Sequence, residues 1–400
     1  MPSQNIALYP WFKFTQNLLF WQAIWFLYFQ QQLSASEAIA LYAVYDISTT
    51  VLEVPSGYMS DRLGRRRTLI FSAVAAIAGM AFIAFGDSFT MFAMGQLCLG
   101  ASIAFASGTD TALLYESLVD AGRADEVEEQ ELRAWRFTFA GLAISAVTGG
   151  AMALYAPALP FLASALAFAG MLFITLRLSE PQRRRSGPHP ALQLGSLGDA
   201  IKHPVLCWLF ALAVLMYGFS HLPFVFGQPF ILSALSNTGL AAQTPLVSGG
   251  VSAIMMLLSV AVSLVALGLR NRIGLTGILL LAFAMQIALA GVLSLTTSAL
   301  AIAFLFLRMV PNALSQPFIL ARIQPLLPDD NRATYLSVQS LVGRLVFAAS
   351  LLLAAGSTTA AGEMPAGDIQ RVLGWYAIAG LFCLVGLALA ARRITMEPST

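Results

Sequence analysis

The sequence predicts an all-α polytopic membrane protein with twelve transmembrane helices in two six-helix bundles. Three observations predict this class: a composition too apolar for a water-facing surface, twelve segments long enough to cross a bilayer, and a partial repeat between the two halves. Of the 400 residues, 58% are hydrophobic and 10% are charged, whereas about a quarter are charged in an ordinary soluble domain. The mean hydropathy is +0.76. Lipid can solvate such a chain because helices satisfy their backbone polar groups internally.

Each predicted span is a mainly apolar segment near the length of about 20 residues that crosses the hydrocarbon core. The first half has six, which are Trp11–Gln31, Ala38–Ser60, Thr68–Gly86, Thr90–Tyr115, Ala134–Leu154 and Ala158–Leu178. The second half has six more, which are Pro204–Leu232, Pro245–Leu269, Leu275–Leu295, Ser298–Leu320, Ala333–Ala355 and Val372–Ala391. The first segment is too long for the apolar region of a signal peptide and no small-residue cleavage site follows it, so we expect an uncleaved span.

The halves are separated by a polar stretch and share a short repeat. Residues 179–203 contain three consecutive arginines and three prolines, so we expect an N-terminal bundle over residues 1–178, a cytoplasmic linker over 179–203 and a C-terminal bundle over 204–400. The loop after the second span reads Asp61-Arg62-Leu63-Gly64, and the loop after the eighth reads Asn271-Arg272-Ile273-Gly274. Twin bundles related as parallel repeats are a transporter architecture, with the substrate site near the midplane.

The distribution of basic residues predicts the orientation. If the N-terminus is inside, 18 of the 22 Lys and Arg residues fall on the inner side, three lie within spans and Arg371 alone falls outside. Cytoplasmic loops are enriched in Lys and Arg. We therefore expect both termini in the cytoplasm.

Several function classes lack the residues that they need. The net charge of +2 gives no case for a nucleic-acid partner. Neither of the two lysines, Lys13 and Lys202, stands in a phosphate-binding loop, so ATP does not drive this chain directly. No hydrolase motif and no Cys/His cluster is present, so we expect no enzyme activity, no metal site and no cofactor. A proton gradient is the expected energy source, because carboxylates lie within spans.

Charged side chains inside the predicted spans are the candidates for the proton and substrate path. An ionisable group at the bilayer centre costs about 2.5–3.5 kcal/mol on insertion scales and usually lines a cavity or pairs with an opposite charge. The set comprises Asp46 and Glu53 in span two, Arg308 in span ten, Arg344 in span eleven and His221 in span seven. A buried pair that fixes helix packing is the alternative for Glu53 and Arg344, and a hydrogen-bonded core histidine is the alternative for His221. Lys13 is expected to extend toward the lipid headgroups.

The loop between spans two and three reads Gly57-Tyr58-Met59-Ser60-Asp61-Arg62-Leu63-Gly64-Arg65-Arg66-Arg67-Thr68-Leu69. We expect Gly57 to let two helices approach closely and Gly64 to adopt the positive φ of a tight turn. Asp61 is expected where span eleven starts, and the N-terminus of that helix would stabilise its carboxylate.

This loop resembles the signature G-x-x-x-D-R-x-G-R-[RK]-x of major facilitator transporters. The preceding Glu53-Val54-Pro55-Ser56-Gly57 resembles a bacterial subset of that superfamily, in which span two ends E-V-P-[ST]-G. The resemblance implies a conformational latch that holds the outward-facing state, with Arg65 reaching Glu116 or, alternatively, Asp110. The residues that it assigns to this latch are Gly57, Asp61, Arg62, Gly64, Arg65, Glu116 and Asp110.

Span five also carries a pattern of small residues, Gly141, Ser145, Ala146, Gly149 and Gly150. It resembles the antiporter motif g-x-x-x-G-P-x-x-G-G without the central Gly-Pro. Small residues there allow spans five and eight to pack tightly.

The leading expectation is a proton-coupled exporter of a drug or metabolite in the bacterial inner membrane. Uptake of a metabolite or siderophore-like anion is the alternative, because Arg308 and Arg344 suit a carboxylate. A non-transporting membrane receptor of transporter fold is the second alternative. The expected partners are a small-molecule substrate and the lipid bilayer, and we expect the chain to act as a monomer.

Overall fold

The computed structural model describes residues 2–181, 203–323, 326–327, 329–358 and 364–396, and over those ranges all regular structure is helical. The chain forms two compact units. The first comprises Met1–Arg185, Ala242–Ala253 and Ala360–Glu363, and the second comprises Ser186–Ala241, Ile254–Thr359 and Met364–Thr400. The expected linker, residues 179–203, lies outside the described residues from position 182 to position 202.

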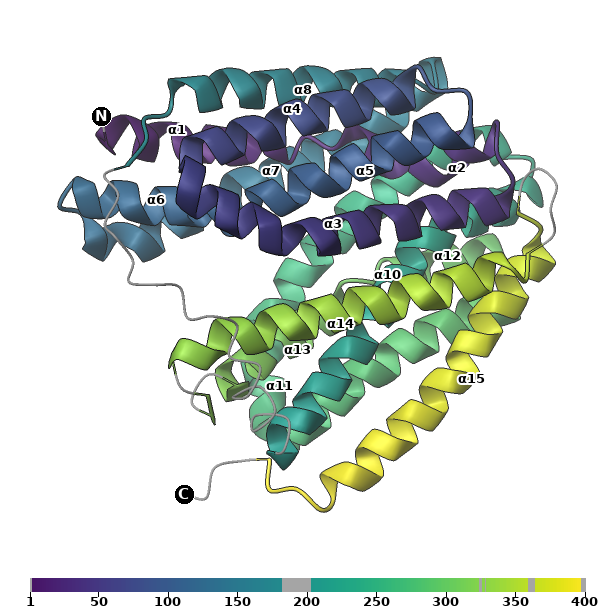
Figure 1. Ribbon diagram of the computed structural model, residues 1–400. Helices are drawn as coiled ribbons and strands as arrows, with labels where there is room; N and C mark the ends of the chain where they lie inside the picture. Colours follow the sequence, from purple (N-terminus) through teal and green to yellow (C-terminus); the bar gives the residue numbers. More distant parts are fainter. Residues whose placement is uncertain (1, 182–202, 324–325, 328, 359–363, 397–400) are drawn as a thin grey trace. The chain divides into compact units, whose positions relative to one another are not determined.

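The first unit is built from eight α-helices of the N-terminal half. They are α1 (Pro2–Gln16), α2 (Trp25–Gln30), α3 (Ala35–Leu63), α4 (Arg65–Ala84), α5 (Phe89–Ala106), α6 (Thr109–Asp120), α7 (Val127–Tyr155) and α8 (Leu159–Arg177), with 3₁₀ turns at Phe20–Ala23 and Ala124–Glu126. α5 packs between α3 and α4, α8 packs on α4, and α1 lies along α7 and α8 (Figure 1). Ser34 and Glu37 form a capping box that fixes the start of α3.

The second unit is built around α10 (Pro204–Ser236). Its other α-helices are the greater part of α11 (Thr244–Leu295), and α12 (Ile302–Leu305), α13 (Val310–Ile323), α14 (Asp329–Ala355) and α15 (Ala366–Ala391). α10 packs against α14 and α15 and also contacts α12 and α13. The side chain of Trp208 ties α10 to α15 by donating to the carbonyl of Leu387 at 2.9 Å.

The described helices account for the predicted spans. Nine of them are long and apolar enough to cross a membrane. One of the nine, which contains α11, covers spans eight and nine together, with a kink at Gly274, where φ is 76°. The remaining two spans correspond to α1 with α2 and to α3. The chain is therefore an all-α polytopic membrane protein.

Three spans that we expected as single helices are interrupted. Span one starts earlier, at Pro2, and is broken between Gln16 and Trp25. Span four is broken at Gly108, whose φ is 70°. Span ten is broken between α12 and α13. Hydropathy did not reveal these breaks, because each lies within a segment that is apolar on average and its backbone groups can still bond locally.

The start of α11 lies with the first unit, although we expected residues 204–400 to form one bundle. Close backbone contacts explain this placement. A Cβ on Gly249 would lie 2.2 Å from the Ala146 carbonyl oxygen, and one on Gly150 would lie 2.4 Å from the Pro245 carbonyl oxygen. Only glycine permits this approach, so α7 and the first turns of α11 pack backbone to backbone.

Candidate functional site

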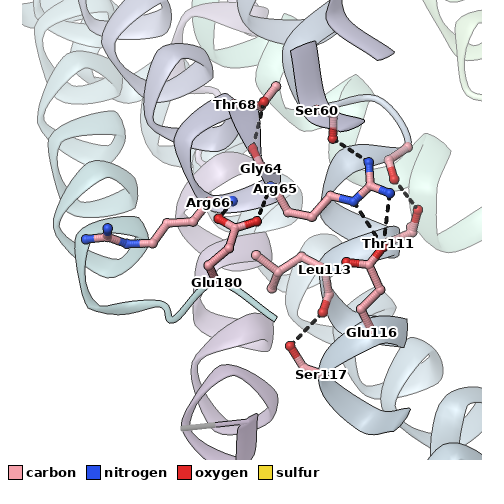
Figure 2. A network of polar contacts seen from close by, with 11 residues as sticks. Ser60, Gly64, Arg65, Arg66, Thr68, Thr111, Leu113, Glu116, Ser117 and Glu180 are labelled. Atoms are coloured by element: carbon pink, nitrogen blue, oxygen red, sulfur yellow. Dashed lines mark hydrogen bonds and ion pairs between the residues drawn. The ribbon is translucent and has the colours of Figure 1, made fainter. Parts of the chain in front are cut away.

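The turn between α3 and α4 places a carboxylate on the N-terminus of α4. Gly64 has φ 106° and ψ 157°, a region populated essentially by glycine. The first N–H groups of a helix lack intrahelical partners, and Gly64 has no side chain to cap them. Glu180 supplies the cap: its carboxylate accepts from the backbone N–H of Arg65 at 2.6 Å and of Arg66 at 3.0 Å (Figure 2).

Glu180 and Gly64 depend on one another. A Cβ on Gly64 would lie 2.5 Å from a Glu180 carboxylate oxygen, so a larger residue would displace the cap. The Arg66 guanidinium also donates to the Leu176 carbonyl at 2.7 Å. The chain that leaves α8 is therefore held against the start of α4 by two separate interactions.

The Arg65 side chain connects three helices of the first unit. Its Nε and Nη2 donate to one oxygen of Glu116, at 3.2 and 3.0 Å, and its Nη1 donates to the Ser60 hydroxyl at 2.7 Å (Figure 2). Ser60 is on α3 and Glu116 on α6. We expected Arg65 to pair with either Glu116 or Asp110, and in the structure it pairs with Glu116.

Asp110, the alternative partner for Arg65, pairs with Lys13 instead. The Lys13 ammonium donates to Asp110 Oδ2 at 2.8 Å, and the exposed fractions of the two side chains are 21% and 8%. Asp110 lies in the first turn of α6 and also accepts from the backbone N–H of Thr111 at 2.8 Å, where the helix dipole favours a negative charge. Lys13 is therefore held inside the unit and does not extend to the headgroups as we expected.

Other residues of the expected latch are placed differently. Gly57 was expected at a close helix contact, and a Cβ added there would meet nothing within 4 Å among the described residues. The guanidinium of Arg62 lies over the Tyr58 ring, 5.1 Å from its centroid. The side chain of Asp61 lies outside the described residues.

Sequence reasoning missed a buried asparagine beside this cluster. Asn5, with 1% of its surface exposed, donates to the Ser117 hydroxyl and to the Ser179 carbonyl, both at 2.8 Å. It also accepts from the Ser179 N–H at 2.8 Å and from the Ser179 hydroxyl at 3.1 Å. One side chain therefore ties α1, α6 and the exit of α8 together. Its only signal in the sequence is a polar residue in an uncharged N-terminal stretch.

Glu180 was also missed, because it stands in a polar segment that we assigned to the linker. A usable signal was the start of α4, where Gly64 cannot cap and an acidic residue from elsewhere is the natural substitute. Around this cluster, Arg123 and Glu126 form a more exposed pair at 2.5 Å. The hydrogen bond from Arg123 lowers the pKa of Glu126.

The predicted path carboxylates lie on α3 in the first unit. Asp46 has none of its surface exposed, and Glu53 is half-buried two helical turns further on. Seven residues in a helix correspond to about 10 Å along one face, so the two carboxylates are not in direct contact.

The predicted basic residues of the path come together in the second unit. The Arg344 guanidinium lies over the Tyr217 ring at 5.6 Å, and the Arg308 guanidinium lies over the Phe224 ring at 4.9 Å. His221 lies between these rings on α10, and the charges of both arginines act on it. Its Nδ1 is 2.7 Å from the Tyr217 carbonyl. Within the described residues, no cluster of three or more His, Cys, Asp or Glu side chains is placed to hold a metal.

Comparison with known proteins agrees with this architecture. The sequence profile of the Major Facilitator Superfamily matches residues 11–351. No curated protein sequence is significantly similar to the chain. The fold is similar to that of the nucleoside transporter NupG, with a TM-score of 0.76, 13% identity, and coverage of 96% of this chain and 98% of that one.

Two further solved structures share the fold. An auto-inhibited peptide transporter of the POT family gives a TM-score of 0.75 at 14% identity, covering 99% of each chain. A D-xylose-proton symporter gives a TM-score of 0.66 at 14% identity, covering 96% of each chain. The family profile covers most of the chain, and the fold agrees over nearly its whole length. The chain therefore belongs to the Major Facilitator Superfamily and is a secondary transporter of small molecules, not an enzyme.

Proposed function

We propose that this transporter couples solute export to proton movement, with Asp46 as the proton-carrying residue. The observation that carries the proposal is the complete burial of Asp46 in the middle of α3. Carboxylates at that depth are rare, because they are costly while charged, and they mark proton relays in pumps and transporters. A D-xylose-proton symporter shares the fold.

Export of a drug or metabolite is the direction that we propose. Its support is the small-residue pattern of α7, which resembles an antiporter motif and packs backbone to backbone with the start of α11. Proton-coupled uptake of a metabolite or siderophore-like anion is the second candidate, favoured by the two arginines near His221. We also propose a bacterial inner-membrane location with both termini cytoplasmic, in keeping with the resemblance of Glu53–Gly57 to a bacterial subset. Family membership leaves the receptor alternative without support.

The cluster formed by Arg65 with Ser60, Glu116 and Glu180 is proposed as part of the conformational latch. Arg65 and its partners hold α3, α4 and α6 together, which keeps Asp61 at a fixed place at the end of α3. We expect Asp61→Asn to slow transport severalfold while expression and thermal stability stay unchanged, because it removes a state-specific contact and no packing. Normal turnover by this variant in vesicles would show that there is no latch.

The test of coupling compares two variants in proteoliposomes. The probe is the compound that stabilises the purified protein most in a thermal-shift screen of antibiotics, siderophores, sugars and organic acids. Asp46→Asn should still exchange the probe downhill but should no longer accumulate it against a gradient. Asp87→Asn is the matched control, because Asp87 is exposed beyond the end of α4, and it should behave as wild type. Uphill transport by Asp46→Asn would contradict the proposal.

The sign of the imposed pH gradient separates the two directions. In everted vesicles with an acidic interior, an exporter accumulates the probe and a proton-coupled importer does not. Accumulation only with the opposite gradient would favour uptake.

A further inference from the structure

Three arginines lie where the start of α4 meets the end of α8 in the first unit. Arg66 and Arg67 are in the first turn of α4, and Arg177 is the last residue of α8. The two helices pack along one another (Figure 1). Their ends are joined by the Glu180 carboxylate on the backbone of Arg66 and by the bond from Arg66 to the Leu176 carbonyl. We name Arg66, Arg67 and Arg177 the arginine cluster.

The arginine cluster carries an excess of positive charge. Within the described residues, none of its three guanidinium groups forms an ion pair. Glu180 is close by, but its two carboxylate oxygens accept the backbone N–H groups of Arg65 and Arg66. The Arg66 guanidinium donates to a backbone carbonyl of α8 and points away from Arg65 (Figure 2). A ligand that brings negative charge is therefore the one that this junction attracts.

The outward face of α4 continues from the arginine cluster as an apolar strip. Arg67, Phe71 and Val74 are spaced by four and three residues, so they share one face of the helix. All three side chains are exposed. This face therefore has a charged group at one end and apolar side chains along the rest of its length.

The outward face of α8 has the same composition in the reverse order along the chain. Leu166, Phe173 and Arg177 are spaced by seven and four residues and share a face of the helix, and all three are exposed. The Arg177 guanidinium lies over the Phe173 ring, 4.4 Å from its centroid. This stacking is a cation–π contact. It holds the charge of Arg177 against the apolar surface of the helix.

Lipid is the solvent of both faces. α4 has 20 residues and α8 has 19, and both helices are long and apolar enough to cross a membrane. Their exposed apolar side chains therefore contact acyl chains, and the arginines at the helix ends lie at the level of the headgroups. Basic pockets between transmembrane helices bind anionic headgroups, because the guanidinium fork matches the oxygens of a phosphate. A zwitterionic headgroup would bring a positive group to a junction that already has an excess of positive charge.

We propose that the arginine cluster binds the phosphate of an anionic phospholipid of the phosphatidylglycerol type, whose acyl chains lie along the outward faces of α4 and α8. The lipid bridges the end of one helix and the start of the other beside the Glu180 cap. It therefore reinforces the turn at Gly64. This binding goes beyond the proposed function, because it depends neither on the direction of transport nor on Asp46.

The first test measures lipid binding to the purified full-length protein in detergent. The probes are phosphatidylglycerol and phosphatidylcholine with the same oleoyl chains, the chain-free headgroup glycerophosphoglycerol, and inorganic phosphate. We expect phosphatidylglycerol to raise the melting temperature with a saturable dependence on its concentration, and the other three to raise it less. Equal stabilisation by phosphatidylcholine would overturn the proposal. A full shift with either chain-free phosphate would also overturn it, because the site would then bind phosphate without lipid.

Variants locate the site. A basic residue near a membrane surface contributes about fivefold to the affinity for anionic lipid, so Arg67→Gln and Arg177→Gln should each weaken phosphatidylglycerol binding about fivefold. Arg177→Lys keeps the charge without the planar fork and should lose less. Arg133→Gln is the matched control, because Arg133 is exposed at the start of α7 outside the cluster, and it should bind as wild type. Unchanged binding in both cluster variants, or an equal loss in the control, would contradict a site at this junction.

A comparison between lipids separates binding from a purely structural role. Arg67 and Arg177 form no hydrogen bond within the described residues, so their glutamine variants should melt as wild type when phosphatidylcholine is the only lipid. They should melt below wild type once phosphatidylglycerol is added. If both variants lower the melting temperature equally in the two lipids, the arginines act on the fold and the lipid site is refuted. Proton coupling would be unaffected by that result.

Discussion

At the scale of single residues, the N-terminus of α4 is fixed by a glycine that makes room for a distant cap. We expect Gly64→Ala to lower the free energy of unfolding by about 1–3 kcal/mol, because its φ and ψ are strained for any side chain. The new Cβ would also displace Glu180. Gly57→Ala, within α3 ahead of the same turn, is the matched control, and it should be neutral or slightly stabilising, since nothing lies within 4 Å of its Cβ. Thermal unfolding in detergent measures both.

A Glu180→Ala variant separates the two causes of this destabilisation, which are backbone strain at residue 64 and displacement of the Glu180 cap. In a Glu180→Ala background, Gly64→Ala should cost less than in wild type, because only the backbone strain remains. An equal cost in both backgrounds would mean that the cap does not contact residue 64.

The Lys13–Asp110 pair gives a second prediction at this scale. Lys13→Met and Asp110→Asn should each destabilise the protein by about 1–3 kcal/mol, since a largely buried charge loses its partner and Lys13 remains partly solvated. The double variant should recover much of the loss.

Arg123 and Glu126 provide the matched exposed pair, with exposed side-chain fractions of 40% and 29%. Their coupling in the same double-mutant analysis should be weaker than that of the Lys13–Asp110 pair, because solvent screens exposed charges. A Lys13–Asp110 coupling no larger than this would show that burial adds nothing to the pair.

The sequence predicted some of these contacts and not others, for a physical reason. The pairing of Arg65 with Glu116 was expected from the resemblance of the loop to the major facilitator signature, and the two charges lie at the ends of consecutive spans. The pairing of Lys13 with Asp110 depended on the break at Gly108, which hydropathy did not reveal. Asn5 and Glu180 act largely through backbone groups of distant segments, so the sequence did not identify them, although the uncapped start of α4 indicated that an acidic cap was needed there.

At the scale of helices, individual glycines of α7 allow particular neighbouring segments to pack closely against that helix. A Cβ on Gly149 would lie 2.0 Å from the Phe20 carbonyl oxygen, beside the break in span one. We expected this small-residue pattern to serve the contact with span eight, and Gly150 does so. Gly149 instead accommodates the 3₁₀ turn at Phe20–Ala23. One motif therefore serves two neighbours.

This arrangement predicts a position-dependent effect of one methyl group. Gly149→Ala should destabilise the protein by about 1–3 kcal/mol, because the methyl group meets backbone that cannot move aside. Gly170→Ala on α8 is the control. Its Cβ would make an ordinary contact of 3.7 Å with Thr15, so it should be neutral or slightly stabilising. Equal melting temperatures for the two variants would contradict the packing of α7 against span one.

At the scale of the whole molecule, composition and the length and spacing of the apolar segments predicted the fold class. A chain with 10% charged residues cannot cover a soluble domain, and the spacing of its apolar segments leaves a helical membrane protein. The loop between α3 and α4 then pointed to the family. Hydropathy could not predict the breaks in spans one, four and ten, because residues such as Arg308 are rare exceptions in apolar runs.

The central claim, proton-coupled transport, is tested most directly by recording both movements in one preparation. Wild-type protein is reconstituted into liposomes that contain a pH-sensitive dye, and flux of the probe from the thermal-shift screen is started by dilution. We predict a pH change inside the liposomes that accompanies solute flux and is abolished in Asp46→Asn. Solute flux that is unaffected when the pH gradient and the membrane potential are collapsed together would contradict the claim.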